Sequence, residues 1–299
     1  MNEQKHLSLR GWTELLLLGL IWGASFVSIR VALDTLPVMT SVLHRTFWAM
    51  LVLWLVTWIG GGGKVPSVPR VWGAFLVMGL LNNVIPFSLM AWGQLYIDTG
   101  LTAILNAATA IFGVLIAAVF FRDERLTKNR LLGVCLGFLG VSIAIGAQNF
   151  LSFSLQSTAQ LAVLAGTVSY ACAAAWARQT LSHLPPVVAA AGMLTASTVL
   201  VLPITLAVDG VPSLALPAIT WAAIGYYAIV ATAGAYLLYY RVLAMAGSGN
   251  LMLVTLVIPP VAIVLGALLR EESLPPNAFL GFAVLAIGLL VLNRSSQPN

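Results

Sequence analysis

The chain consists of long apolar runs separated by short polar connections. Each run has about 16–24 residues, close to the ~20 that a helix needs to cross a bilayer core of about 30 Å. The runs are continuous, whereas the strands of a membrane β-barrel alternate apolar and polar residues. The pattern therefore predicts an all-α integral membrane protein with ten transmembrane helices. The predicted helices are Trp12–Leu33, Met39–Ile59, Val71–Trp92, Leu101–Phe121, Leu131–Ala147, Thr158–Ala177, Val187–Val208, Pro217–Tyr240, Asn250–Leu269 and Asn277–Leu292.

Composition supports the same class of protein. Hydrophobic residues make up 60% of the 299 residues and charged residues 8%, whereas soluble domains contain about 25% charged residues. A water-soluble surface cannot be built from so few charges. A soluble enzyme, a nucleic-acid-binding module and a disordered chain are therefore excluded. We expect membrane lipids, and not nucleic acid, among the partners.

Basic residues predict how the chain is oriented in the membrane. With ten spans both termini lie on one side, and most of the 14 Lys and Arg residues fall on that side. The opposite side receives only Arg30, Arg45 and Arg270. Because Lys and Arg are enriched in cytoplasmic loops, we expect both termini in the cytoplasm and the chain in a bacterial inner membrane. Arg45, near the outer end of its span, is expected to reach the outer headgroups.

One constant offset of 148 residues aligns the two halves of the chain, residues 1–148 and 149–299, without a gap. It pairs Arg30 with Arg178 near the start of the repeat. Further pairs are Pro37 with Pro185, Glu124 with Glu272, Gly133 with Gly281 and Gly140 with Gly288. Each half holds five spans, an odd number, so the second half enters the membrane from the opposite side. Such an inverted repeat around a central cavity lets a transporter alternate access, and a duplication relic in a channel or scaffold is the alternative.

Several motifs are shared with a known group of carriers. They are Trp22-Gly-Ala-Ser-Phe in the first span, Arg45 early in the second, and the loop residues Glu124 and Glu272, each followed by a span that carries glycines. In these motifs the chain resembles the drug/metabolite transporter superfamily, in the form of two tandem EamA domains. The resemblance covers essentially the whole chain. It implies a central cavity lined by spans one to four and six to nine, peripheral fifth and tenth spans, and export of small metabolites.

Polar side chains inside the third and fourth spans are candidates for a substrate site. Asn83 and Met90 share one helical face of the third span, and Asn106 and Thr109 share one face of the fourth. Buried amides are costly in a bilayer unless they are hydrogen-bonded. These residues either line a cavity or hydrogen-bond between helices.

Aromatic residues and a proline pair near mid-depth extend the candidate site. Trp22, its repeat counterpart Tyr170, and Tyr236 are candidates to gate the cavity or stack on a ligand, although packing between helices is the commoner use of such rings. Pro259 and Pro260 are expected to bend or interrupt the ninth helix. The carbonyls freed there would meet a substrate ammonium, so that a zwitterion would fit without a fixed charge on the protein.

His44 completes the set of candidates. A histidine inside a span either carries a proton or is a hydrogen-bonded structural residue. No acidic residue lies deep in a predicted span, so no proton or sodium site is visible. Gly60–Gly63 with Lys64 does not form a P-loop, because Val65 replaces the required hydroxyl residue. We therefore expect no cofactor and no bound metal.

Together these patterns predict a transporter of small metabolites and not an enzyme. The preferred function is an amino-acid exporter, aromatic amino acids included, that alternates access to a small-molecule substrate. A multidrug or other metabolite efflux carrier of the same superfamily is the alternative. A nucleotide-sugar carrier is disfavoured, because phosphates need a cationic site and all three outer-side arginines are expected near the surface. The oligomeric state stays open, since Gly133 and Gly137 either pack internally or form a homodimer face.

Overall fold

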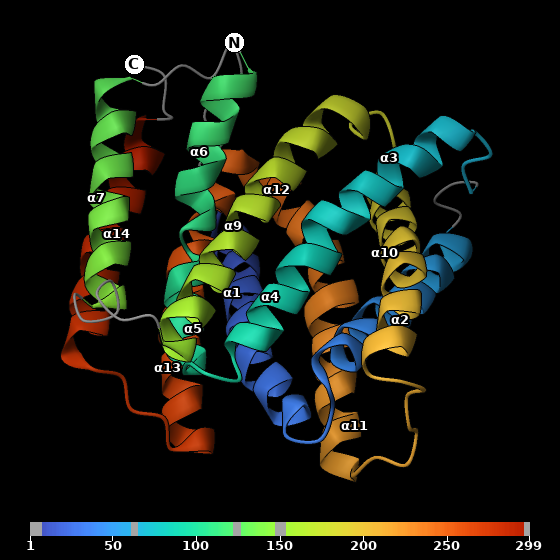
Figure 1. Cartoon of the computed structure of the whole chain (residues 1–299). Helices are drawn as coiled ribbons and strands as arrows, with labels where there is room; N and C mark the ends of the chain where they lie inside the picture. Colours follow the sequence, from blue (N-terminus) through green and yellow to red (C-terminus); the bar gives the residue numbers. More distant parts are fainter. Residues whose placement is uncertain (1–7, 61–64, 122–126, 147–153, 296–299) are drawn as a thin grey trace.

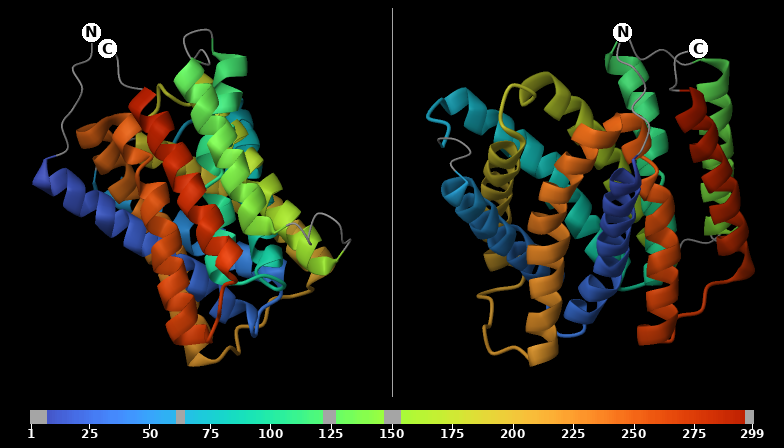
Figure 2. Two further views of the ribbon diagram at one scale, coloured as in Figure 1. Left: turned by 90° about the vertical axis from the view of Figure 1, so that its left-hand side faces the viewer. Right: turned by 180° about the vertical axis from the view of Figure 1, so that it is seen from behind.

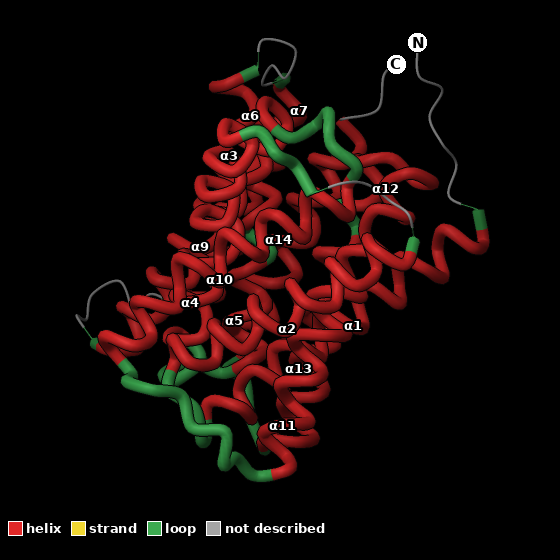
Figure 3. Tube along the Cα trace, turned by 90° about the vertical axis from the view of Figure 1, so that its right-hand side faces the viewer, coloured by secondary structure: helices red, strands yellow, loops and turns green. Residues whose placement is uncertain are grey.

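The structure is a computed structural model that describes residues 8–60, 65–121, 127–146 and 154–295. Every regular element in these ranges is a helix, and short connections join the helices at their ends (Figures 1 and 3). The predicted all-α membrane fold is confirmed. The elements are α1 Leu9–Leu33, α2 Val38–Ile59, α3 Pro69–Gly79, η1 Leu80–Val84, α4 Ile85–Gly93, α5 Thr99–Asn106, α6 Thr109–Phe120, α7 Lys128–Ile145, α9 Leu155–Thr180, α10 Pro186–Val208, α11 Ala218–Ile224, η2 Gly225–Gly234, α12 Ala235–Leu251, α13 Val254–Arg270 and α14 Pro276–Ser295.

These elements account for the ten predicted spans. Nine spans in the described part of the chain are long and apolar enough to cross a membrane. The tenth, α13, is a shorter apolar helix of 17 residues, which covers about 26 Å at the helical rise per residue. Three spans are composite: α3, η1 and α4 form the third, α5 and α6 the fourth, and α11, η2 and α12 the eighth.

Local signals start several of the spans. The side chains of Ser8, Thr127 and Ser154 accept a hydrogen bond from a backbone N–H three residues later, at α1, α7 and α9. Such caps satisfy backbone donors that a helix start leaves unpaired. Proline stands in the first turn of α3 and α10, where its missing N–H removes no helical hydrogen bond.

A π-helical segment interrupts the third span of each half. It is η1 in the first half and η2 in the second. The repeat offset places Leu80–Val84 on residues 228–232, which lie inside η2, so the two interruptions are equivalent. A π-turn contains one more residue than an α-helical turn. Side chains before the π-turn are therefore rotated relative to those after it, compared with an unbroken α-helix.

Helices that correspond in the two halves make corresponding contacts. α1 packs on α13, and the counterpart α9 packs on α6. α2 packs on its own counterpart α10, and α7 packs on its counterpart α14. The α7–α14 pair lies at one edge of the molecule (Figures 1 and 2), where α7 also packs on α5 and α6. The predicted boundary between residues 148 and 149 lies outside the described residues.

Close glycine contacts show how α7 and α14 run. A Cβ atom on Gly133 would lie 2.9 Å from the Gly288 carbonyl oxygen, and one on Gly140 would lie 2.7 Å from the Gly281 carbonyl oxygen. An early residue of one helix thus meets a late residue of the other, so these repeat counterparts are antiparallel, as an inverted repeat requires. The contacts assign Gly133 to packing within the chain and not to a homodimer face.

Candidate functional site

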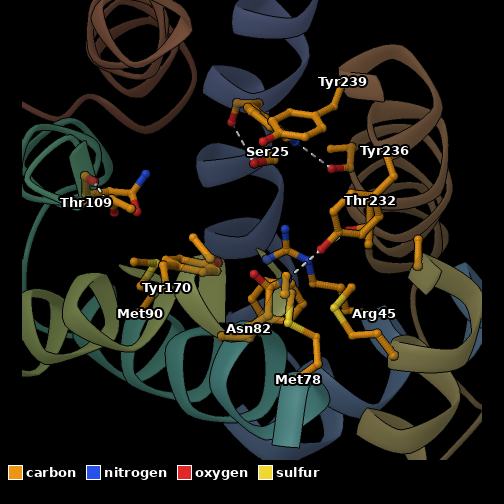
Figure 4. A pocket seen from close by; sticks show the side chains of 18 of the residues that line it. Ser25, Arg45, Met78, Asn82, Met90, Thr109, Tyr170, Thr232, Tyr236 and Tyr239 are labelled. Atoms are coloured by element: carbon orange, nitrogen blue, oxygen red, sulfur yellow. Dashed lines mark hydrogen bonds between the residues drawn. The ribbon is translucent and has the colours of Figure 1, made fainter. Parts of the chain in front are cut away.

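A cavity of about 600 Å³ lies between the two halves of the chain (Figure 4). Every span contributes to its described lining except the fifth and the tenth, α7 and α14. The division into lining and peripheral spans is the one that the resemblance implies. Arg45 and Arg178 belong to the lining, and none of its described residues is Asp or Glu.

The cavity opens at the end of the molecule where α1 begins and α14 ends. Ser182, in the connection from α9 to α10, and Pro186, the first residue of α10, line the cavity and are exposed. Arg178 stands near this mouth, and its guanidinium carbon lies 4.1 Å from the centre of the Phe121 ring. Solutes therefore reach the cavity from this end.

Polar contacts between the two halves close the opposite end. Asp34 accepts hydrogen bonds from Arg270 at 2.6 and 3.1 Å, and from Arg30 at 2.9 Å. Asp209 accepts from the backbone N–H of Thr40 at 2.7 Å and from its hydroxyl at 2.9 Å. These bonds join α1 to the end of α13, and α2 to the end of α10. Charge-assisted bonds of this kind are stronger than neutral ones.

Two further contacts join the halves at this end. The hydroxyls of Thr35 and Thr220 hydrogen-bond at 2.8 Å. Glu272 accepts from the backbone N–H of Thr99 at 2.9 Å and also from its hydroxyl, at the start of α5, where the helix dipole favours a carboxylate. Burial, and then the charge of Glu272, raise the pKa of the neighbouring Asp98 carboxyl. We call the contacts of Asp34 with Arg30 and Arg270, Asp209 with Thr40, Thr35 with Thr220, and Glu272 with Thr99 the closed-end network.

Arg45 lies in the cavity and not at the outer headgroups, so the sequence-based expectation for it is wrong. Its Nε donates to Thr232 Oγ1 at 3.0 Å, and its guanidinium carbon lies 3.7 Å from the centre of the Phe87 ring. Arg45 is about 10 Å along the axis from the first residue of α2, and its contacts direct it inward instead of along the lipid. The expectation of a site without fixed charge is wrong for the same reason. The missed signal was an ionisable residue within a span, which marks a functional site by default.

Asn82, and not Asn83, contributes to the cavity lining. Asn83 is fully buried, where it donates to Ser197 Oγ at 2.8 Å and accepts from the Tyr236 hydroxyl at 3.4 Å. Asn82 lines the cavity and donates to the Tyr236 hydroxyl at 3.0 Å. The difference has a local cause in η1. Stepping back four residues from the lining residue Phe87 reaches Asn83, but across a π-turn the step is five residues and reaches Asn82.

Met90, Asn106 and Thr109 line the cavity. The Thr109 hydroxyl donates to the Asn106 carbonyl oxygen at 2.7 Å, across the break between α5 and α6. The side-chain Oδ1 of Asn106 is buried and has no hydrogen-bond partner among the described residues. An unpaired buried acceptor costs about 1–3 kcal/mol, so a donor brought by a ligand would be stabilised here.

Trp22, Tyr170 and Tyr236 also line the cavity. Trp22 Nε1 donates to the Ala231 carbonyl oxygen in η2 at 3.1 Å, and the Trp22 ring centre lies 5.9 Å from that of Tyr239. The aromatic candidates therefore combine both interpretations: they pack between helices, and they form part of the cavity wall. These residues give the cavity wall apolar ring faces together with the polar N–H and O–H groups at the ends of the side chains.

His44 does not line the cavity. Its Nδ1 accepts from Trp48 Nε1 at 3.2 Å, and its ring packs edge-on against Trp221 with 5.6 Å between centres. Its Nε2 is buried without a partner in the part of the chain that the structure describes. These contacts favour the structural interpretation of this histidine over a proton carrier in the cavity.

Pro259 is buried in α13 outside the lining. Of the two predicted effects of the proline pair, an interruption of the helix is wrong, and a bend stays a prediction. α13 runs through Pro259 and Pro260 as one helix that begins at Val254. A proline ring disturbs the carbonyl four residues before it, and both of these carbonyls lie in the first turn of α13. The chain leaves the helical conformation earlier, at Met252–Leu253, between α12 and α13. From Val254 onward α13 continues through both prolines without a break.

The side chains that line this cavity are suited to binding a ligand. No group of three or more His, Cys, Asp or Glu side chains within the described ranges is placed to hold a metal ion. The polar side-chain groups of the lining are amides, hydroxyls, guanidinium groups and the indole N–H of Trp22. Such groups orient a ligand by hydrogen bonds while the apolar remainder of the wall holds its hydrocarbon part.

Comparison with known proteins agrees with two repeats. Residues 10–146 and residues 157–294 each match the EamA-like transporter family. A solved crystal structure has the same fold, with a TM-score of 0.68 at 16% sequence identity over 99% of this chain and 100% of that one.

Two relatives carry names that describe transport. A probable amino-acid metabolite efflux pump of Escherichia coli is 25% identical over 287 residues, 92% of each chain. A probable terminal-alkyne amino-acid exporter of Streptantibioticus cattleyicolor is 26% identical over 276 residues, 91% of this chain and 90% of that one. The sequence also resembles, more narrowly, that of the bacterial amino-acid exporter YddG, and this narrower resemblance stays a prediction. The chain belongs to the EamA-like transporter family, within the drug/metabolite transporter superfamily, and is a multi-pass membrane transporter of small molecules and not an enzyme.

Proposed function

We propose that the protein exports amino acids, aromatic ones included, across a bacterial inner membrane by alternating access. The observation that carries this proposal is a cavity between the two halves that opens at one end, while the closed-end network joins the halves at the other. Two conformations that exchange the open and closed ends would move a solute across the membrane. The antiparallel course of α7 and α14 supports two halves of opposite orientation, which such an exchange uses.

The positive-inside rule supports the direction. It places the start of α1 and the end of α14 on the cytoplasmic side, which is the end where the cavity opens. The conformation described here is then the inward-facing state, ready to take a substrate from the cytoplasm. The closed-end network forms the outer gate.

The shape and chemistry of the cavity fit an amino acid with an apolar side chain. Its volume falls in the range of about 300–1,000 Å³ that is common for small-molecule sites. Trp22 and Tyr170 offer ring surface to a hydrocarbon or aromatic side chain, while Asn82 and Asn106 offer amide groups to its polar end. The names of the two exporters described above support the same class of substrate.

Counterflow in proteoliposomes tests this function. Vesicles preloaded with unlabelled phenylalanine, leucine or a lipophilic cationic drug are diluted into the corresponding labelled compound. We expect transient accumulation of labelled amino acids that Asn106→Ala reduces about tenfold or more, as expected when a buried hydrogen-bonding group in a binding site is lost. Gly113→Ala is the matched control in the adjoining helix, because a Cβ there would meet no atom within 4 Å. Accumulation of the drug alone would replace this proposal with multidrug efflux.

A further inference from the structure

The described lining of the cavity carries positive charge and no negative charge. Its arginines, Arg45 and Arg178, lie at different depths. Arg178 stands near the mouth, in the last turn of α9, whereas Figure 4 shows Arg45 reaching toward the middle of the cavity. A guanidinium group keeps its proton in proteins. A low-dielectric cavity of one sign concentrates ligands of the opposite sign and repels those of the same sign.

Two contacts hold Arg45 and leave its outer nitrogens available. The Nε atom donates to Thr232 Oγ1 at 3.0 Å, and the flat guanidinium lies over the Phe87 ring, 3.7 Å from its centre. The Thr232 hydroxyl in turn donates to the Tyr227 carbonyl oxygen at 2.7 Å, which turns its oxygen toward Arg45 as an acceptor. None of these contacts uses the Nη atoms.

Arg45 has no acidic partner in the described part of the chain. The four ion pairs found there involve Glu14 and Asp34, which lie near the two ends of α1. A charge within a membrane protein is stabilised by a partner of opposite sign or by water in a cavity. The partner that fits a guanidinium best is a carboxylate, which accepts two parallel N–H···O bonds.

We propose that Arg45 binds the carboxylate of the transported substrate and so selects carboxylate-bearing molecules over their neutral or cationic analogues. The inference rests on the proposed amino-acid transport, and it specifies which end of the substrate is anchored. Asn82 and Tyr236, joined by a hydrogen bond of 3.0 Å, lie beside Arg45 and add polar atoms at the same place (Figure 4). Because α2 belongs to the first half and η2 to the second, the anchor lies where the halves meet.

The test is a ligand–variant cycle on the purified full-length protein in detergent. Bound tritiated L-phenylalanine is displaced either by L-phenylalanine or by L-phenylalaninamide, in which a neutral amide replaces the carboxylate. We expect the wild type to prefer phenylalanine by about 10- to 100-fold, the effect of one charge-assisted pair. In Arg45→Gln the preference falls to about one, because both ligands then meet the same neutral side chain.

Two matched variants separate charge from structure. Arg45→Lys keeps the positive charge but cannot donate two parallel hydrogen bonds to a carboxylate. We therefore expect its preference for phenylalanine over phenylalaninamide to lie between those of the wild type and of Arg45→Gln. Arg70→Gln removes an exposed arginine at the start of α3 that does not line the cavity, and it keeps the wild-type preference.

Each other outcome has one meaning. Equal affinity of the wild type for the two ligands overturns the carboxylate anchor, whether or not a variant folds, and leaves amino-acid transport standing. If Arg45→Gln weakens the binding of both ligands equally and the preference for phenylalanine is retained, Arg45 is a structural residue. That outcome also overturns the carboxylate anchor. No binding of tritiated phenylalanine to the wild type contradicts the proposed amino-acid substrate, and the anchor with it.

Discussion

The Arg270–Asp34 pair in the closed-end network gives the most quantitative prediction about gating. Both Nη atoms of Arg270 donate to the Asp34 carboxylate, at 2.6 and 3.1 Å, and the two side chains are 26% and 38% exposed. Arg270→Gln removes this charged fork. Asp34 keeps Arg30 at 2.9 Å, so the variant leaves no isolated carboxylate.

The magnitude follows from the partial exposure. Fully exposed ion pairs contribute about 0.2–1 kcal/mol, and hydrogen bonds to charged groups contribute about 1.5–3 kcal/mol when shielded. A half-shielded fork is therefore expected to stabilise the closed outer end by about 1–2 kcal/mol. If the pair breaks when this end opens, Arg270→Gln raises the outward-open population about 5- to 30-fold.

The assay is thiol labelling of a cavity position from outside. Ser25 lines the cavity, and Ser25→Cys is placed in a background in which the free cysteines Cys135 and Cys172 are replaced. A membrane-impermeant reagent added outside reacts in proportion to the outward-open fraction, so Arg270→Gln should speed labelling about 5- to 30-fold. High salt should speed the wild type in the same direction, because screening weakens the pair. An unchanged rate in Arg270→Gln would refute the gating role of this pair.

Three further predictions concern packing, pH and orientation. Gly140→Ala places a Cβ 2.7 Å from a backbone carbonyl oxygen of α14, so it should destabilise the protein by about 1–3 kcal/mol or more in thermal unfolding; an unchanged melting temperature would contradict the tight α7–α14 contact. Burial and a neighbouring glutamate raise the pKa of Asp98, so the folded protein binds this proton more tightly than the unfolded chain does. Above the pKa that Asp98 has in the folded protein, its ionised carboxylate destabilises the fold. This destabilisation disappears once the pH falls below the pKa that Asp98 has in the unfolded chain. Asp98→Asn should melt higher than the wild type near neutral pH and equal to it in acid; a gap that does not shrink on acidification would argue against the shift. A single cysteine at the exposed Ser213 should label from outside intact cells, and one at Lys128 should not; the opposite pattern would reverse the orientation.

The membrane helices could be predicted from sequence because the bilayer imposes a simple requirement on each span. The run Trp12–Leu33 became α1, Leu9–Leu33, and Val187–Val208 became α10, Pro186–Val208. The ends differ by a few residues because capping residues lie just outside the apolar run. The spacing of Gly133 and Gly137 predicted close helix contact, and both glycines lie in the α7–α14 contact.

The site was predictable only to the level of a helix face. Trp22 and Tyr170 were found because they are repeat counterparts at mid-depth, and both line the cavity. Asn83 was chosen in place of Asn82 because hydrophobic periodicity does not reveal a π-turn, which shifts the face by one residue. Arg45 was assigned to the headgroups because the partners that hold it inward, Phe87 and Thr232, come from other spans.

Alternating access of the cavity is tested most directly by blocking transport from each side through one cavity residue. Ala174 lines the cavity and is exposed, so Ala174→Cys, without the two native cysteines, presents a single thiol there. An impermeant thiol reagent should abolish counterflow quickly from the cytoplasmic face, and from the outer face only while substrate is being exchanged. A thiol that never reacts from outside during transport, or a fully modified protein that still transports, would contradict a single cavity that opens to each side in turn.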